Sequence, residues 1–443
     1  MIINHYCNSF LSVEVNGKKI VCDPWIGATN ESAWYSYPFF NQTSFLNEIK
    51  PDFIYISHLH CDHFDPKTLL DYNNKKTQII IKEFKNKRLK DKISELGYKN
   101  IIEIKEWRKT KISNDFNIAI VPQMSSNSSD LDDEVSYDLD TSIIIQSRIN
   151  KKIFYNNVDN PLSTNNLIEL NKFIKNSFKG ALSAFCYPLG AASGYPQTYL
   201  SVNKVSEKNR IINTSLNKVR GILKIFNPEV YFPAGGTYLI SGKFHLLNKW
   251  IAQPNNNQIV KFFKDTPYKV VNIEGGGYIN LDNNNIEYKE IDSNLDTLKK
   301  EIGLKLSKIK YFYQYKEFEK SINLIDRLFD ECQEKYIERI KKLNIKKNWN
   351  IQVSIYKNLI LNNNGKIDGN KSGFLKTYLI KNSYSYHSKN IDLTCHLDKK
   401  LFYNLMLRGS PWNTALTGSI IMFHRKSKIY SPTTENSLNF FTK

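Results

Sequence analysis

The sequence has few of the residues that build cross-linked or membrane-bound proteins. Its 443 residues include only 6 Cys, scattered without paired spacing, which excludes a disulfide framework. No run of about 18 apolar residues occurs, so no membrane-spanning helix is expected. The N-terminus lacks the basic start and long apolar stretch of a signal peptide. These absences predict a soluble, cytoplasmic protein.

Acidic residues are scarce relative to basic ones. There are 43 Asp and Glu against 62 Lys and Arg, a formal net charge of +19. Such a surface attracts nucleic acid, anionic lipid or phosphorylated sugars. The basic residues are interspersed, however, and no nucleic-acid-binding signature accompanies them. We therefore interpret the charge mainly as compositional drift in a chain rich in Asn, Ile and Lys, and we do not expect a nucleic-acid partner.

The order of the expected elements predicts the fold class. Hydrophobic residues make up 41% of the chain, enough to fill real cores, and the length favours two domains. Short strands come first, and helices interleaved with further strands follow, which predicts an α/β protein with an αββα sandwich. Long charged helices and then more strands follow. We predict one domain over 1–285, and a helical linker plus a smaller C-terminal α/β domain over 296–443.

Histidine is also scarce, yet three of the 8 His lie within residues 57–65, Ser-His-Leu-His-Cys-Asp-His-Phe-Asp. This string directly follows an apolar strand. A strand that ends in a tight loop can turn His58, His60, Asp62 and His63 toward a single point. Imidazole and carboxylate are the ligands that zinc and iron bind when thiolates are absent. The string therefore predicts a site for one or two divalent metal ions, iron or zinc.

The spacing within this string suggests how two metals would be held. Alternation along an extended segment puts His58, His60 and Asp62 on one side, and Asp62 and His63 then divide between two metal positions. Zinc at such a site supplies hydroxide near neutral pH, whereas iron can activate O₂. The ligands alone do not choose between these chemistries.

Four residues elsewhere are further candidates. Asp159 and Asp140 lie where strands are expected to end, so Asp159 could bridge two metals and Asp140 could be a ligand or a partner of a ligand imidazole. Asp23 also follows a strand, and we expect it to support the ligands from behind. His245 is an additional candidate ligand. The alternative is that each Asp only ends a strand or caps a turn, and that His245 is structural.

Glycine clusters occur at 190–194, 234–236 and 275–277. None fits a dinucleotide-binding or P-loop pattern. Turn formation is the default interpretation, and the alternative is that small residues let the backbone approach a substrate or metal closely.

Several motifs together resemble a known family. Residues 57–65 resemble the signature of the metallo-β-lactamase superfamily. Further motifs resemble, in order, the metallo-β-lactamase-like and C-terminal regions of the CMP-N-acetylneuraminate hydroxylase family: 21–27, 140–144, 157–159, 190–196, 232–235, 408–412, Gly418 and 425–430. The likeness covers nearly the whole chain.

The resemblance implies a metal-dependent enzyme that acts on a nucleotide-activated acidic sugar or glycan precursor. It places His58 and His60 at a first metal, Asp62 and His63 at a second, and Asp159 between the two metals. Asp62 and Asp159 would also be the catalytic carboxylates. The partner would be an anionic small molecule such as a CMP-sugar. That family carries a Rieske domain, whereas this sequence contains no Cys-x-x-His. Hydroxylation would therefore need a separate Rieske or ferredoxin-type electron donor.

The sequence also departs from the superfamily pattern. Regions 122–125 and 233–235 lack the His that related hydrolases carry after later strands. A ligand set without these His residues would hold one metal rather than two, or would recruit His245 or Asp140. Metal-water hydrolysis remains open beside hydroxylation, because the ligands alone do not choose between them. A non-catalytic binding protein that retains the fold is the first alternative, and a phosphodiesterase or nuclease of the same superfamily is the second.

Overall fold

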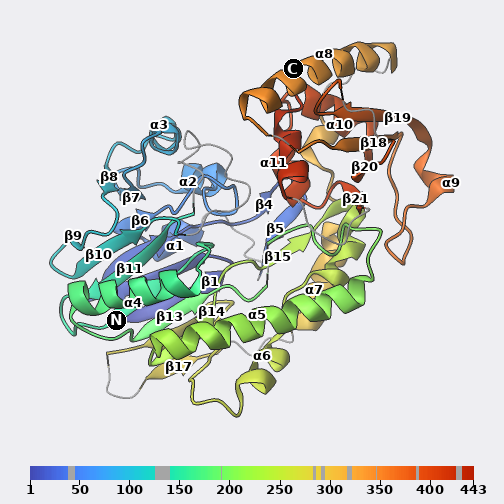
Figure 1. Cartoon of the computed structure of the whole chain (residues 1–443). Helices are drawn as coiled ribbons and strands as arrows, with labels where there is room; N and C mark the ends of the chain where they lie inside the picture. Colours follow the sequence, from blue (N-terminus) through green and yellow to red (C-terminus); the bar gives the residue numbers. More distant parts are fainter. Residues whose placement is uncertain are drawn as a thin grey trace.

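Two large sheets form the main body of the computed structural model (Figure 1). The structure describes residues 1–37, 45–124, 140–190, 192–282, 286–290, 295–316, 322–345, 347–385, 389–425 and 432–443. Within these residues, the larger sheet has the spatial order β17 (Glu287–Lys289), β16 (Gly277–Asn280), β1 (Ile2–Cys7), β2 (Phe10–Val15), β3 (Lys18–Cys22), β6 (Phe53–Tyr55), β7 (Gln78–Lys82), β8 (Ile101–Ile104). The second has the order β14 (Val230–Pro233), β13 (Ala184–Tyr187), β12 (Ile153–Asn156), β11 (Ser142–Ser147), β10 (Phe116–Val121), β9 (Thr110–Lys111).

The two sheets pack face to face between layers of helices. One buried apolar cluster takes residues from both sheets, such as Ile3 and Ile145. A second cluster joins the outer face of the larger sheet to α1 (Phe45–Ile49), α2 (Pro66–Asp71) and α3 (Arg88–Glu95). A third joins the smaller sheet to α4 (Thr164–Phe178), α5 (Lys204–Phe226) and α6 (Asn256–Phe263). The predicted αββα sandwich is therefore confirmed.

Local sequence signals explain several of these elements. Asn16 and Gly17 have φ of 50° and 75°, so they supply the left-handed turn that joins β2 to β3. Asp65 caps α2 because its side chain accepts a hydrogen bond from the Lys67 N–H, and Pro66 occupies the first turn. Asn203 caps α5 in the same way. The predicted bounds of α2, 66–71, match the structure.

A third, small sheet connects the sandwich to the C-terminal part of the chain. It contains β15 (Tyr238–Ile240), β5 (Trp34–Ser36) and β4 (Ala28–Thr29), and the 3-10 helix η2 (Gly242–Trp250) follows it. Its buried residues, such as Trp34 and Tyr238, belong to the same apolar cluster as Trp349 and Ile351. The C-terminal part therefore packs on this sheet through a continuous core.

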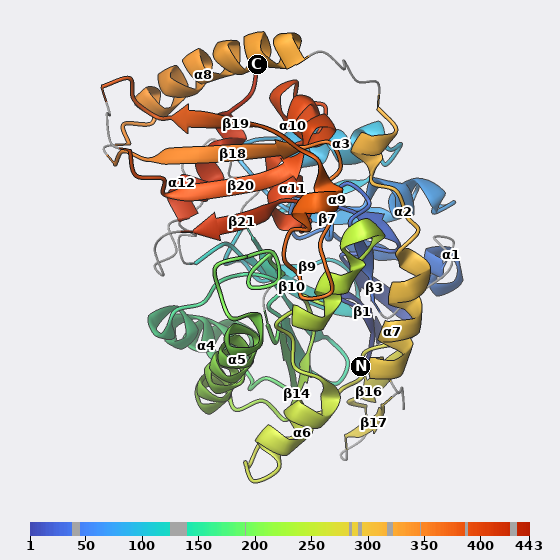
Figure 2. The same ribbon diagram turned by 90° about the vertical axis from the view of Figure 1, so that its right-hand side faces the viewer.

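The C-terminal part forms a four-stranded mixed sheet with helices around it (Figure 2). The strand order is β19 (Phe374–Lys381), β18 (Asn350–Tyr356), β20 (Leu393–Asp398), β21 (Met422–Arg425). The surrounding helices are η3 (Phe312–Gln314), α8 (Ile322–Lys342), α9 (Gly369–Ser372), α10 (Lys399–Met406), α11 (Trp412–Thr417), α12 (Pro432–Asn436) and η4 (Ser437–Phe440). The preceding helix α7 (Leu295–Leu306) packs instead against β15 and η2.

Two sequence expectations need comment. The sequence from 419 to 423 favours a strand, but the observed strand is shifted toward the C-terminus, because β21 begins at Met422. The predicted division between 285 and 296 includes residues 285 and 291–294, which lie outside the described residues, and it stays a prediction. Among the helices that the structure describes, none has the length and apolar character needed to cross a bilayer.

Candidate metal centre

One edge of the sandwich gathers the ends of strands from both sheets. β3 and β6 run parallel, so Asp23 and the loop that begins at Ile56 leave the larger sheet side by side. β11 runs antiparallel to β12, so the start of β11 and the end of β12 share the same edge of the smaller sheet. Asp140 precedes β11 and Asp159 follows β12. The topology therefore brings the candidate residues of four strands to one place.

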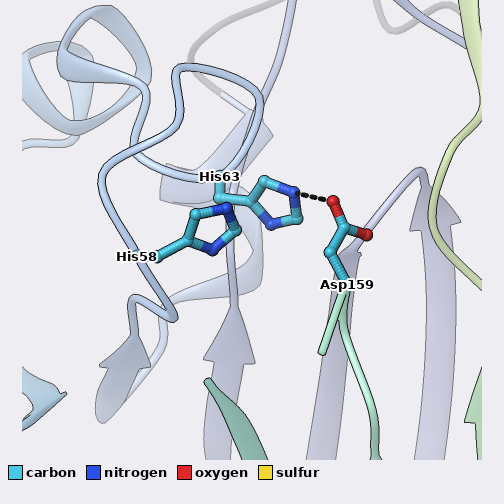
Figure 3. Close-up of side chains that lie close together, drawn as sticks. All are labelled: His58, His63 and Asp159. Atoms are coloured by element: carbon cyan, nitrogen blue, oxygen red, sulfur yellow. Dashed lines mark hydrogen bonds and ion pairs between the residues drawn. The ribbon is translucent and has the colours of Figure 1, made fainter. Parts of the chain in front are cut away.

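The histidines and carboxylates meet at short distances across this edge. His58 Nε2 lies 2.8 Å from His60 Nδ1 and 3.3 Å from Asp140 Oδ1. His63 Nε2 lies 3.1 Å from Asp159 Oδ2 and 3.6 Å from Asp62 Oδ2. Figure 3 shows the His58 and His63 rings beside one another, with a tilt of 39° between their planes, and His63 directed at Asp159.

These side chains form two overlapping sets of donors. One set is His58, His63 and Asp159, and the other is His58, His60 and Asp140; within each set the donor atoms lie within 4.8 Å of one another. Neutral imidazole and carboxylate are ligands of zinc and of iron, so both sets fit a divalent metal ion. The role of these residues as ligands stays a prediction.

The backbone of the motif differs from the extended segment that the sequence suggested. The N–H groups of His63 and Phe64 both donate to the His60 carbonyl, over 3.0 and 2.8 Å. The chain therefore turns tightly, and it brings the His63 ring to 4.2 Å from the His58 ring. The two donor sets share His58. The predicted division, with Asp62 and His63 at a second metal and Asp159 between the metals, stays a prediction.

Asp23 and Ser57 hold the histidines from behind. The Asp23 carboxylate accepts hydrogen bonds from the Ser57 N–H, from the Ser57 hydroxyl at 2.6 Å and from His63 Nδ1 at 2.9 Å. Because Ser57 gives its proton to Asp23, its oxygen accepts from His58 Nδ1, 2.9 Å away. With Nδ1 engaged in this way, the Nε2 atom of each ring faces the carboxylates.

Electrostatics at this edge favour a bound cation. Burial lowers the pKa of His58 well below its usual value, and the imidazoles of His63 and His60 act in the same direction. Burial alone would also lower the pKa of His63, but the carboxylates of Asp62, Asp159 and Asp23 outweigh it and raise that pKa well above the usual value. The carboxylates therefore hold a positive charge at His63, and a metal ion would take the place of that proton.

Other residues of the motif serve the fold. Asp65 caps α2 and also accepts a bond from the Ile26 N–H over 3.4 Å. The Cys61 thiol donates to Asn30 Oδ1 over 3.0 Å, and burial raises the pKa of this thiol to about 11. Cys61 is therefore held as a neutral thiol, tied to the loop before β5.

Two observations correct the list of candidates. Ser57, which links Asp23 to His58, was not singled out from the sequence, although its position between strand and motif is a usable signal. His245 joins neither donor set; it lies in η2, where its Nδ1 donates to the Gly242 carbonyl over 3.1 Å. Asp23 contacts His63 and Ser57, as expected for a supporting residue.

Sequence comparisons connect the chain to two kinds of protein. No protein-family model matches it. A protein of Mycolicibacterium smegmatis named as a Rieske 2Fe-2S iron-sulfur protein is 31% identical over 101 residues, 23% of this chain and 20% of that protein. The cytidine monophosphate-N-acetylneuraminic acid hydroxylase of Xenopus laevis is 27% identical over 266 residues, 57% of this chain and 40% of the hydroxylase. The resemblance to the hydroxylase is thus confirmed, while this chain spans less than half the length of either relative.

Among solved structures, a possible metal-dependent hydrolase from Veillonella parvula has a TM-score of 0.45 and 12% identity. The match covers 63% of this chain and 99% of that one. The layers of sheets and helices described above, independently of this match, establish the αββα architecture.

Proposed function

We propose that this chain is a metal-dependent enzyme that binds one or two divalent metal ions, iron or zinc, at the edge of its sandwich. The observation that carries the proposal is the pair of overlapping donor sets, in which the Nε2 atoms of His58 and His63 face carboxylates. Burying several imidazoles and carboxylates at one site costs free energy. A bound cation removes that cost.

His58 limits how the sets can be used. Its Nδ1 is engaged by Ser57, so it has one lone pair and can serve one metal at a time. One metal would take His58, His63 and Asp159. A second metal would then rely on His60 and Asp140 with other ligands. Asp62, 3.6 Å from His63 Nε2, is placed to hold a proton beside the metal.

When bound, the metal would supply either activation of O₂ or a hydroxide nucleophile, depending on its identity. The chain's own residues prepare this site. Asp23 and Ser57 fix the orientation of both rings. The loss of such a partner typically lowers metal affinity about 10–100-fold. The burial of His58 and His63 keeps bulk water away from the ligand nitrogens.

The substrate class rests on the relatives. We propose an anionic small molecule, a nucleotide-activated acidic sugar such as a CMP-sugar, because the similarity to the hydroxylase covers 57% of this chain. The net charge of +19 favours such a ligand. The reaction would be a hydroxylation with electrons from a separate Rieske or ferredoxin-type protein, since this chain has no Cys-x-x-His.

Hydrolysis by a metal-bound water is the second candidate. The donor sets contain only imidazole and carboxylate, and catalytic zinc sites use the same ligands. This reaction needs no electron donor, so metal identity separates the two candidates.

Metal analysis of anaerobically purified protein tests the proposal. We expect about one or two equivalents of iron or zinc in the wild type and a loss of most of it in His58→Ala/His60→Ala, measured by elemental analysis. Iron-loaded protein is then incubated with CMP-N-acetylneuraminate, O₂ and a reductase system, and a mass gain of one oxygen is sought. Unchanged metal in the double variant would contradict the site. Wild-type protein without stoichiometric metal would favour a non-catalytic binding protein.

A further inference from the structure

Two glycines after β14 border the candidate metal centre. Gly235 and Gly236 have φ of 101° and 77°, a conformation that other residues rarely adopt. Their N–H groups donate to the backbone oxygen of Asn8 at 2.8 Å and to its side-chain oxygen at 2.6 Å. The turn between β1 and β2 therefore fixes the glycine backbone beside the site.

The first glycine lies next to a candidate ligand. A Cβ on Gly235 would lie 3.2 Å from Pro188 Cβ, 3.6 Å from Asp159 Oδ1 and 3.6 Å from Ser9 Oγ. Asp159 uses its other oxygen, Oδ2, for His63. Ser9 and the free oxygen of Asp159 thus face the same small space over Gly235.

Two buried polar side chains line this backbone without partners. Ser9 is 2% exposed and Gln253 is 8% exposed. Among the residues that the structure describes, neither the Ser9 hydroxyl nor the Gln253 amide has a hydrogen-bond partner. Gln253 Nε2 lies 3.7 Å from the position of a Cβ on Gly236. Buried polar groups without partners are rare and destabilise a fold, so a bound polar group or water that pairs with them would stabilise it.

We infer that Ser9, Gln253 and the backbone of Gly235 and Gly236 form a subsite for an uncharged polar group of the substrate, a hydroxyl or a carboxamide. A serine hydroxyl and a glutamine amide each donate and accept hydrogen bonds, so a group that does both satisfies them. The adjacent Asp159 carboxylate disfavours a second anion here. The inference rests on the proposed metal centre, which the subsite adjoins through Asp159.

Ser9→Ala and Gln253→Met, in the metal-loaded protein, test the subsite. The probes are acetohydroxamate, a metal ligand that carries an amide N–H and oxygen atoms, and azide, a metal ligand with no donor, both titrated by calorimetry. We expect each variant to lower the affinity for acetohydroxamate about fivefold to tenfold, which is the effect of one lost hydrogen bond. The affinity for azide should change less than about twofold. Because each variant removes a buried group without a partner, the Tm of the metal-free protein should stay unchanged or rise.

Ser12→Ala is the matched control. Ser12 is also buried, but its hydroxyl pairs with the Tyr6 hydroxyl at 3.0 Å. Its variant should lower Tm and leave acetohydroxamate affinity unchanged. The subsite is overturned if Ser9→Ala and Gln253→Met behave like this control, or if they weaken both probes equally. A wild type without metal would refute the metal centre itself, and the subsite with it.

Discussion

Buried carboxylates occur in two regions of this molecule and have different partners. In the C-terminal sheet, Asp398 forms an ion pair with Lys243 at 2.7 Å and accepts the Tyr313 hydroxyl at 2.6 Å. At the edge of the sandwich, no Lys or Arg among the described residues forms an ion pair with Asp62 or Asp159; their cationic partner is His63. A carboxylate with its own lysine completes the fold. Carboxylates gathered around imidazoles leave a place for an external cation.

The largest expected effect follows from breaking the lysine pair. Asp398→Ala leaves the Lys243 ammonium, 20% exposed, without its carboxylate and also removes an acceptor for the Leu359 N–H. We expect a loss of about 3–5 kcal/mol in the free energy of unfolding, because a largely buried charge stays unpaired. Urea denaturation measures the loss, and the metal bound per folded molecule should not change.

An exposed ion pair provides the control for this prediction. Asp326 pairs with Lys376 at 2.7 Å, with side chains 35% and 44% exposed. Asp326→Ala should cost about 1 kcal/mol or less. If Asp398→Ala costs no more than this control, or if the folded variant loses its metal, the distinction between the two regions is wrong.

The second prediction addresses the edge of the sandwich. Asp23→Asn weakens the acceptor for His63 Nδ1 and Ser57, so the rings lose the orientation that directs Nε2 toward the carboxylates. We expect metal affinity to fall about 10–100-fold, as for other partners of metal ligands, measured by competition with a chelator.

Asp65→Ala is the control within the same motif. Asp65 caps α2 and contacts neither histidine in the described structure, so its loss should cost about 1 kcal/mol in stability and little metal affinity. Equal losses of metal affinity in both variants would mean that Asp23 supports the fold of the loop and not the ligands.

The layers of the fold could be predicted because they depend on local patterns. The hairpin of β2 and β3, the helix α2 and the helix α5 all carry their own turn or cap residues, and alternating apolar segments imply strands. The C-terminal strand β21 was shifted in the prediction. The run from Ile420 to Phe423 is apolar throughout, so its hydrophobicity does not reveal where pairing with β20 starts.

The site was predictable in composition but not in pairing. The string at 57–65 contains the histidines, and strand ends point to Asp140 and Asp159. The sharing of His58 between two sets, in contrast, depends on the turn at His60, which brings His63 back beside it. The His63 ring is also held by a long-range contact with Asp23, which no local spacing reveals.

The smallest expected effect concerns the residue that the structure separates from the site. His245 is half-buried in η2, and its Nδ1 bonds only within that helix in the contacts described. His245→Ala should therefore leave metal content and chelator competition unchanged and cost about 1 kcal/mol or less in stability. Loss of metal in this variant, on the scale of His58→Ala/His60→Ala, would place His245 at the centre. It would show that the ligands rearrange when the cation binds. The contrast between the carboxylate paired with Lys243 and the carboxylates around His63 would then be smaller in the metal-bound protein.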